Sequence, residues 1–194
     1  MISDGPWTYV VAAVVSYLLG SVNPASVMAR VRHIDLRSTG SGNPGATNAA
    51  RAMGTTTGTV VGVIDVLKGF VPAMAFTMLA GPSVGDVAGF CAVLGHITSP
   101  WLKGHGGKGV ATTLGAVMGT HPFWLLAILP AFALGFWGFR RIGLASVVAC
   151  LSLIVVAFVM GQTVEDTVFG VALGLLVLMR HRRNIEAFIR LQRQ

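Results

Sequence analysis

Three polar stretches interrupt a chain that is otherwise built from long apolar runs. They are STGSGNPGATNAAR (38–51), GHITSPWLKGHGGKGVATT (95–113) and RHRRNI (180–185). All three combine Arg or Lys with glycine, hydroxyl or amide groups, which are the groups that proteins use to hold phosphate. The chemistry that they suggest is therefore the binding of one or more phosphate groups.

The first stretch contains GSGNPG (Gly40 to Gly45), which imitates the G-x-G-x-x-G fingerprint of dinucleotide-binding domains, with Asp65 twenty residues beyond it. That fingerprint needs a preceding buried strand, whereas this loop follows HIDLRS and Asp65 falls inside an apolar segment. We therefore expect an anion-binding turn in which Gly40, Gly42 and Gly45 let backbone amides face the ligand. The side chains assigned to this turn are Ser41, Asn43, Thr47 and Asn48 as neutral donors and Arg51 as the fixed cation. The alternative is a hydrated turn that caps a helix.

The second stretch contains GHGGKG (104–109), which differs from the P-loop of nucleotide-binding proteins. A P-loop has glycine five residues before its GK pair and Ser or Thr after the lysine, where this chain has Leu102 and Gly109. Lys108 lies among glycines, just before the start of a predicted helix that has Thr113 in its first turn. This arrangement still indicates an anion site. The residues assigned to it are Gly106, Gly107, Lys108, Gly109 and Thr112. An ordinary basic loop is the alternative, and His96 suits either a structural hydrogen bond or the site.

The third stretch ends the last apolar segment and brings a histidine and an amide together. His181 and Asn184 are three residues apart, so a helix would place them on roughly one face. Arg180, Arg182 and Arg183 are explained by the helix dipole and by the anionic inner leaflet, neither of which requires the histidine or the amide. We therefore predict that His181 and Asn184 belong to the site.

The residue types that are missing narrow the chemistry further. No carboxylate pair, cysteine nucleophile or G-x-S-x-G motif accompanies the polar stretches, and no histidine begins the H-x-x-x-x-D motif of many glycerolipid acyltransferases. Asp and Glu are too few for a magnesium site, and Cys91 and Cys150 form neither a CxxC motif nor a Cys/His cluster. We predict no metal and no cofactor. The site would hold phosphates and would not itself supply a nucleophile.

The elements that must position these stretches are membrane helices. The chain of 194 residues is 54% hydrophobic and only 11% charged, against about a quarter charged in soluble proteins. Apolar segments of membrane-crossing type are predicted at 7–30, 55–79, 86–102, 109–120, 122–139, 143–161 and 166–180. The fourth is short for a full crossing and would be tilted or re-entrant. We predict one integral membrane domain, residues 1–194, that is all-α with about seven transmembrane helices.

Charges at the ends of these segments alternate, and this alternation predicts the orientation. Lys and Arg follow the first, third, fifth and seventh segments, whereas Asp4, Asp86, Glu165 and Asp166 lie at the other junctions. By the positive-inside rule the N-terminus is outside, the C-terminus is cytoplasmic, and all three polar stretches share the cytoplasmic face. The net charge of +7 therefore reflects topology and does not indicate nucleic acid.

Two ionisable residues, Asp65 and Lys68, lie inside the second apolar segment. Ionisable residues within a membrane mark either function or an internal pair. Their spacing of three permits an ion pair within one helix, and we favour that structural role over chemistry.

Taken together, the motifs resemble those of the bacterial acyl-phosphate:glycerol-3-phosphate acyltransferases, the PlsY family. The family's GSGNxGATNxxR is matched by Gly40 to Arg51, its GHxFPxFxxFKGGKGVAT by GHITSPWLKGHGGKGVAT, and its RHxxNIxRL by RHRRNIEAFIRL. GSVNP near residue 20 and DVLKGF at 65–70 are also similar to family sequence. The departures are ITSP and His105 within the second motif, EAF before IRL, and RRIGLASV where the family has a Ser-rich segment.

The resemblance implies that acyl phosphate gives its acyl group to the 1-hydroxyl of glycerol 3-phosphate, producing lysophosphatidic acid and inorganic phosphate in the first step of phospholipid synthesis. The catalytic residues that it implies are Ser41, Arg51, Lys108, His181 and Asn184. Ser41, Gly42 and Lys108 would lie near the acyl phosphate, and Arg51, His181 and Asn184 would hold the glycerol 3-phosphate. Ser146, from the Ser-rich position, is added to the substrate-binding residues.

The expected partners are acyl phosphate, glycerol 3-phosphate and membrane lipids, and the protein is expected to act as a monomer in the bacterial cytoplasmic membrane. A mixed anhydride is already activated, so positioning and charge stabilisation would supply most of the catalysis, with substrate phosphate or His181 accepting the proton. One alternative is a phosphate-ester transporter, although its site would lie near mid-bilayer. Another is a lipid-binding scaffold, which leaves the glycine loops unexplained.

Overall fold

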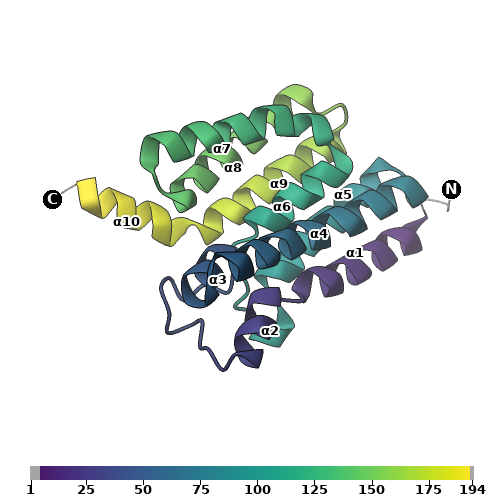
Figure 1. Cartoon of the computed structure of the whole chain (residues 1–194). Coiled ribbons are helices and arrows are strands. Elements are labelled where there is room, and N and C mark those ends of the chain that lie inside the picture. Colours follow the sequence, from purple (N-terminus) through teal and green to yellow (C-terminus); the bar gives the residue numbers. More distant parts are fainter. Residues whose placement is uncertain (1–4, 193–194) are drawn as a thin grey trace. The chain divides into compact units, whose positions relative to one another are not determined.

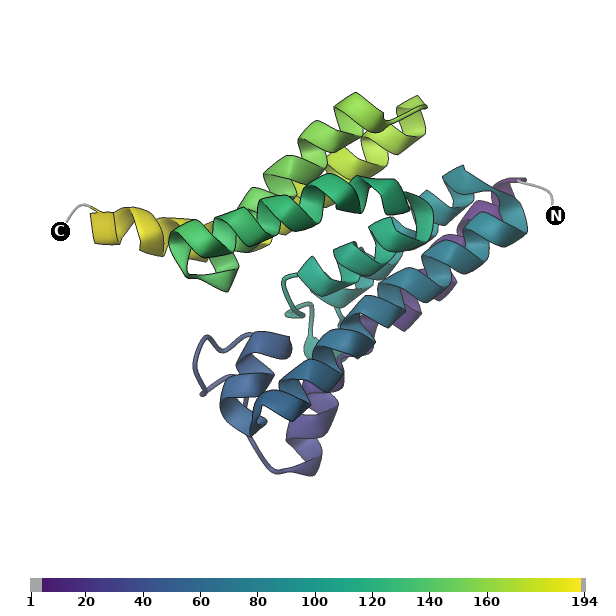
Figure 2. The ribbon, with the colours of Figure 1, turned by 45° about the horizontal axis from the view of Figure 1, so that its top comes forward.

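The helices of this chain fall into two compact units that divide between Thr120 and His121, and each unit is described by itself. The computed structural model describes residues 5–192. The elements of the first unit are α1 (Pro6–Ser21), α2 (Pro24–Val31), α3 (Ala46–Met53), α4 (Thr55–Ala80), α5 (Pro82–Ile97), the 3-10 turn η1 (Pro100–Leu102) and α6 (Val110–Thr120). Helices α1, α4 and α5 pack alongside one another, while α2 and α3 lie where α4 begins (Figure 1, Figure 2).

The first predicted span, 7–30, is interrupted in the structure between α1 and α2. Pro24 has no N–H to donate and forces the residue before it out of the helical region, so Asn23 is extended, with φ −113° and ψ 100°. The Asn23 side chain accepts a 2.8 Å hydrogen bond from the backbone N–H of Ser26 and so caps α2. The chain therefore changes direction at the point where the apolar run contains its only Asn-Pro pair.

Small residues let the helices of the first unit approach one another at backbone distance. A Cβ added to Gly115 of α6 would lie 2.0 Å from the Val66 carbonyl of α4, and one added to Gly95 of α5 would lie 2.1 Å from the Tyr17 carbonyl of α1. Close approach through small residues is typical of membrane helices, where van der Waals contact drives association. The unit is therefore held by packing that larger side chains at these positions would prevent.

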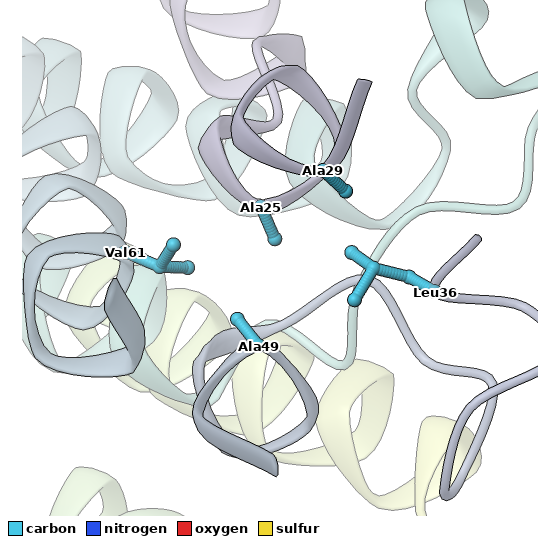
Figure 3. Packing of buried hydrophobic residues seen from close by; sticks show 5 residues of the cluster. All are labelled: Ala25, Ala29, Leu36, Ala49 and Val61. Atoms are coloured by element: carbon cyan, nitrogen blue, oxygen red, sulfur yellow. The ribbon is translucent and has the colours of Figure 1, made fainter. Parts of the chain in front are cut away.

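A cluster of small apolar side chains anchors the loop after α2. Figure 3 shows Ala25 and Ala29 of α2, Ala49 of α3, Val61 of α4 and Leu36 of the loop facing one another, and all five are buried. Because Leu36 inserts into this cluster, the polar stretch that follows it starts from a fixed point.

The second unit contains the 3-10 turn η2 (Pro122–Trp124) and four helices: α7 (Leu125–Phe139), α8 (Ile142–Met160), α9 (Val164–Arg180) and α10 (Arg182–Gln192). Helix α8 packs against both α7 and α9. Thr163 and Asp166 form a capping box that starts α9, with the Thr163 hydroxyl accepting from the Asp166 N–H at 3.1 Å. Helix α9 ends at the turn that carries His181.

The predicted apolar segments correspond closely to observed helices, and all regular structure in residues 5–192 is helical. The third segment was predicted to reach 102 but ends at Ile97, because the chain turns at Ser99-Pro100. The stretch Pro6–Val31, made of α1 and α2 together, and the helical stretches Thr55–Ala80, Pro122–Phe139 and Ile142–Met160 are long and apolar enough to span a membrane, whereas Val110–Thr120 is shorter. The count of seven spans, the orientation and the single domain stay predictions, and Asp4 lies outside the described residues.

Candidate active site

The first glycine loop is held in place by a buried side chain of α3. Gly40 and Gly42 have positive φ values of 55° and 66°, which favour glycine. Asn48 is buried, its Oδ1 accepts from the Ser41 N–H at 3.0 Å, and its Nδ2 donates to the Leu36 carbonyl at 3.0 Å. Asn48 therefore shapes the loop from beneath, and its assignment to substrate binding stays a prediction.

Other members of the first stretch remain open to solvent. Ser41, Thr47 and Arg51 are exposed, and the Arg51 side chain lies along the loop, with its Cδ 3.5 Å from where a Gly40 Cβ would be. Within residues 5–192 the Arg51 guanidinium has no acidic partner. Asn43 is half-buried, and its amide nitrogen would lie 2.8 Å from a Gly45 Cβ. The loop thus presents a hydroxyl and an unpaired cation side by side.

The second glycine loop folds back onto the end of α5. The N–H groups of Gly106 and Gly107 donate to the carbonyls of Ile97 and His96 at 2.9 and 3.1 Å. A Cβ on Gly106 would lie 1.9 Å from the His96 carbonyl, and one on Gly107 would lie 2.1 Å from Nε2 of the same histidine. These two glycines are therefore needed for close packing, whatever they bind.

Lys108 follows this packed pair and leads into α6. Its side chain is half-buried, and Gly109, with φ 89°, turns the chain into the helix. Thr112 and Thr113 lie in the first turn of α6, as predicted, and both are buried. Their hydroxyls have no hydrogen-bond partner among the described residues. Buried hydroxyl groups normally have a hydrogen-bond partner, so a bound ligand could supply the partner for these two.

Arg37 joins the two glycine loops, a role that the sequence reasoning missed. Its Nη1 donates to the Gly42 carbonyl at 3.2 Å, and its Nη2 donates to the His105 carbonyl. In the sequence, Arg37 is one of the basic residues that follow the first apolar segment. The one sequence signal for its role in the site is its position immediately before the Ser-Thr-Gly run. The first and second polar stretches are therefore brought together within the first unit.

The predicted ion pair on α4 is confirmed, and a histidine extends it. Lys68 Nζ lies 2.9 Å from Asp65 Oδ1, and His96 Nδ1 lies 3.5 Å from the same oxygen. His96 is buried and its carbonyl supports Gly107. The structure thus gives His96 a structural contact; its assignment to substrate binding stays a prediction.

The second unit buries the histidine of the third stretch and brings the amide close to the start of α8. His181 is 1% exposed, and its Nδ1 is 2.9 Å from the Val177 carbonyl. A carbonyl only accepts, so Nδ1 carries the hydrogen, which fixes the tautomer of the neutral ring. The Asn184 amide nitrogen packs over Gly143, where an added Cβ would lie 2.0 Å from it. Ser146, one turn further along α8, is buried and donates to the Ile142 carbonyl at 2.9 Å.

Comparison with known proteins agrees with these features over nearly the whole chain. A family model described as glycerol-3-phosphate acyltransferase matches residues 10–191. A glycerol-3-phosphate acyltransferase of Aquifex aeolicus is 38% identical over 177 residues, covering 90% of this chain and 92% of that protein. One of Endomicrobium trichonymphae is 36% identical over 178 residues, covering 91% and 89%.

Two solved structures are similar in fold as well as in sequence. Both are crystal structures of PlsY (YgiH), an integral membrane glycerol 3-phosphate acyltransferase. The glycerol 3-phosphate form has a TM-score of 0.90 at 36% identity, and the lysophosphatidic acid form has a TM-score of 0.87 at 35% identity. Each match covers 94% of this chain and 92% of the other.

The apolar helices and these comparisons together define a multi-pass integral membrane acyltransferase. The chain belongs to the PlsY family of glycerol-3-phosphate acyltransferases, as its three motifs indicated.

Proposed function

We propose that this protein transfers an acyl group from acyl phosphate to the 1-hydroxyl of glycerol 3-phosphate, giving lysophosphatidic acid and inorganic phosphate. The observation that carries the proposal is the pair of glycine loops, bearing Arg51 and Lys108, that Arg37 joins within one unit. Two cationic, glycine-rich surfaces suit two phosphate-bearing substrates, and membership of a membrane acyltransferase family supports the same interpretation. The similar solved structures are a glycerol 3-phosphate form and a lysophosphatidic acid form, which supports the same acceptor and product.

In this reaction the acceptor oxygen forms a bond to the acyl carbonyl carbon. The bond between that carbon and the bridging phosphate oxygen breaks, and inorganic phosphate leaves with the electron pair. Ser41, Gly42 and Lys108 would bind the acyl phosphate, and Lys108 would stabilise the charge that develops on the leaving phosphate. Arg51, His181 and Asn184 would hold the glycerol 3-phosphate; this grouping follows from the sequence motifs. Because the donor is already activated, the protein needs no nucleophile of its own.

The proton of the attacking hydroxyl has two candidate acceptors. One is the phosphate of a substrate. The other is Nε2 of His181, because hydrogen bonding of Nδ1 to the Val177 carbonyl makes Nε2 the basic nitrogen of the neutral ring. Membrane lipids would surround the monomer and deliver the acyl donor.

The test is an assay of purified protein in lipid with palmitoyl phosphate and glycerol 3-phosphate, measuring inorganic phosphate and lysophosphatidic acid together. Parallel samples contain palmitoyl-CoA in place of the acyl phosphate, or no acceptor. The proposal expects equal amounts of both products, only when acyl phosphate and acceptor are both present. Phosphate release without lipid product would identify a hydrolase, and product from palmitoyl-CoA alone would contradict the proposed donor.

A further inference from the structure

A buried group of three ionisable side chains lies inside the first unit, and none of the three takes part in the chemical steps described above. Asp65 and Lys68 belong to α4 and His96 belongs to the end of α5, with each side chain less than one-tenth exposed. The single oxygen Asp65 Oδ1 faces both the Lys68 ammonium, at 2.9 Å, and the His96 ring, at 3.5 Å. The group therefore ties two helices together at one point.

On one side, this group supports the break between α1 and α2. Lys68 Nζ donates to the Val22 carbonyl at 2.7 Å. In a continuous helix that carbonyl would accept from the Ser26 N–H, which here donates to the Asn23 side chain instead. Lys68 thus gives the Val22 carbonyl the hydrogen bond that it loses where the helix is interrupted. From the same break, Asn23 Nδ2 donates to the Pro44 carbonyl of the first glycine loop at 2.9 Å.

On the other side, the same group supports the second glycine loop. The His96 carbonyl accepts from the Gly107 N–H at 3.1 Å, and the His96 ring fills the space where a Gly107 Cβ would stand. Lys108 is the next residue. A change in the tilt of the His96 ring would therefore be transmitted to the backbone beside the lysine of this loop.

We propose that Asp65, Lys68 and His96 form a positioning network that sets the two glycine loops relative to each other. The chain of contacts runs from Pro44 through Asn23 and Val22 to Lys68, and from Asp65 through His96 to Gly107. A buried ion pair contributes little net stability, because burial costs each charge its hydration. The contribution of this one is geometric: it fixes where Ser41 and Lys108 stand. Its catalytic meaning rests on the proposed function, which assigns those residues to substrate.

The first test measures the arrangement of the loops without any substrate. Spin labels are attached to cysteines introduced at the exposed residues Ser38 and Lys103, after Cys91→Ala and Cys150→Ala have removed the native thiols. Electron paramagnetic resonance in lipid then gives the distribution of distances between the loops. Lys68→Met is expected to broaden this distribution, whereas Ser16→Ala, which alters a buried polar residue of α1 outside the network, should leave it unchanged.

The second test measures kcat and KM for both substrates in the unlabelled variants. Lys68→Met is expected to lower kcat at least tenfold, and Asn23→Ala should lower it as well. Combining the two should cost less than the product of the single losses, because both substitutions cut the same link. Asp65→Glu should also be less active than the native protein. The longer side chain keeps the negative charge but cannot keep both the 2.9 Å contact with Lys68 and the 3.5 Å contact with His96.

The outcomes separate this proposal from the proposed function. A narrow, unchanged distance distribution in Lys68→Met overturns the positioning network, whether activity is kept or lost. A broadened distribution with lowered kcat supports both. A broadened distribution with unchanged kcat supports the network and contradicts the role of the loops in binding substrate. If Lys68→Met fails to fold because Asp65 loses its cation, Asp65→Asn with Lys68→Met removes both charges and is measured instead.

Discussion

The backbone N–H of Ser41 donates to Oδ1 of Asn48 at 3.0 Å, so the loop residue that is proposed to meet the acyl phosphate is held by a buried amide seven positions further along. The same Asn48 side chain also reaches the Leu36 carbonyl. One side chain therefore closes the first glycine loop at both ends, and the exposed face of that loop is left to Ser41 and the neighbouring Arg51.

Asn48→Ala should destabilise the protein and disorder the loop. It leaves the Ser41 N–H and the Leu36 carbonyl without partners, at a cost of about 1–3 kcal/mol for each group that stays buried. Asn48→Asp should be at least as damaging, because it keeps the acceptor for Ser41 but buries a carboxylate against the Leu36 carbonyl oxygen. Thermal unfolding in detergent, read beside turnover, checks this; an alanine variant with wild-type melting temperature would show that Asn48 does not hold the loop.

Arg51→Ala should lower turnover by about 100-fold or more while the protein still inserts, because it removes the unpaired cation beside the first glycine loop. Arg51→Lys should recover only part of the loss, since an ammonium lacks the forked geometry of guanidinium. Arg190→Ala, at an exposed position of α10, is the control. Normal turnover of a correctly inserted Arg51→Ala protein would remove this residue from the proposed site.

Lys108→Ala should lose activity to a similar degree, and Lys108→Arg should not fully restore it. The lysine is half-buried between glycines that pack tightly on α5, so a broader guanidinium has little room. Steady-state kinetics with acyl phosphate varied at saturating glycerol 3-phosphate would measure the effect on the donor. Full rescue by arginine would indicate that the loop contributes only charge.

Gly106→Ala should be far more damaging than a substitution at Gly104. The new Cβ would stand 1.9 Å from the His96 carbonyl, so the loop must move and Lys108 with it. Gly104 has open space around it and φ 77°, a conformation that asparagine tolerates, so Gly104→Asn serves as the matched control. Equal kcat and KM in the two variants would show that close packing on α5 does not place the lysine.

Gly143→Ala should reduce activity although Gly143 carries no functional group. Its Cβ would stand 2.0 Å from the Asn184 amide nitrogen and displace that side chain. Gly138→Ala is the control, because nothing lies within 4 Å of its Cβ and alanine favours a helix by roughly 1 kcal/mol. Turnover of the two variants at equal expression in membranes decides the matter. An unaffected Gly143→Ala enzyme would argue that Asn184 need not hold its observed position.

The sequence was sufficient for the long apolar helices, because length and composition alone determine such segments. Their ends depended on finer signals: the Asn23-Pro24 pair broke the first span, and Ser99-Pro100 ended the third early. For the candidate site, residue types were enough to predict which stretches of the chain form it, but not which of their side chains are exposed to solvent. Asn48 was expected to bind substrate and is buried in structural hydrogen bonds, and the Ser146 hydroxyl is bonded to its own helix.

The role of Arg37 could not be predicted, because it depends on two loops that are 68 residues apart in the chain meeting in space. The pairing of Asp65 with Lys68 was predictable, since three residues along one helix bring side chains together. Its extension to His96 needed knowledge of which helix packs beside α4. Local spacing is visible in a sequence, whereas contacts between helices are set by packing.

Helix α6 is 11 residues long, so at 1.5 Å per residue it measures about 16 Å, roughly half the thickness of a hydrocarbon core. The mismatch must be relieved, either by thinning of the bilayer around the helix or by one helix end lying below the headgroups. Lys108 stands at one of these ends. In the second case, a lipid that carries phosphate could meet Lys108 without leaving the membrane.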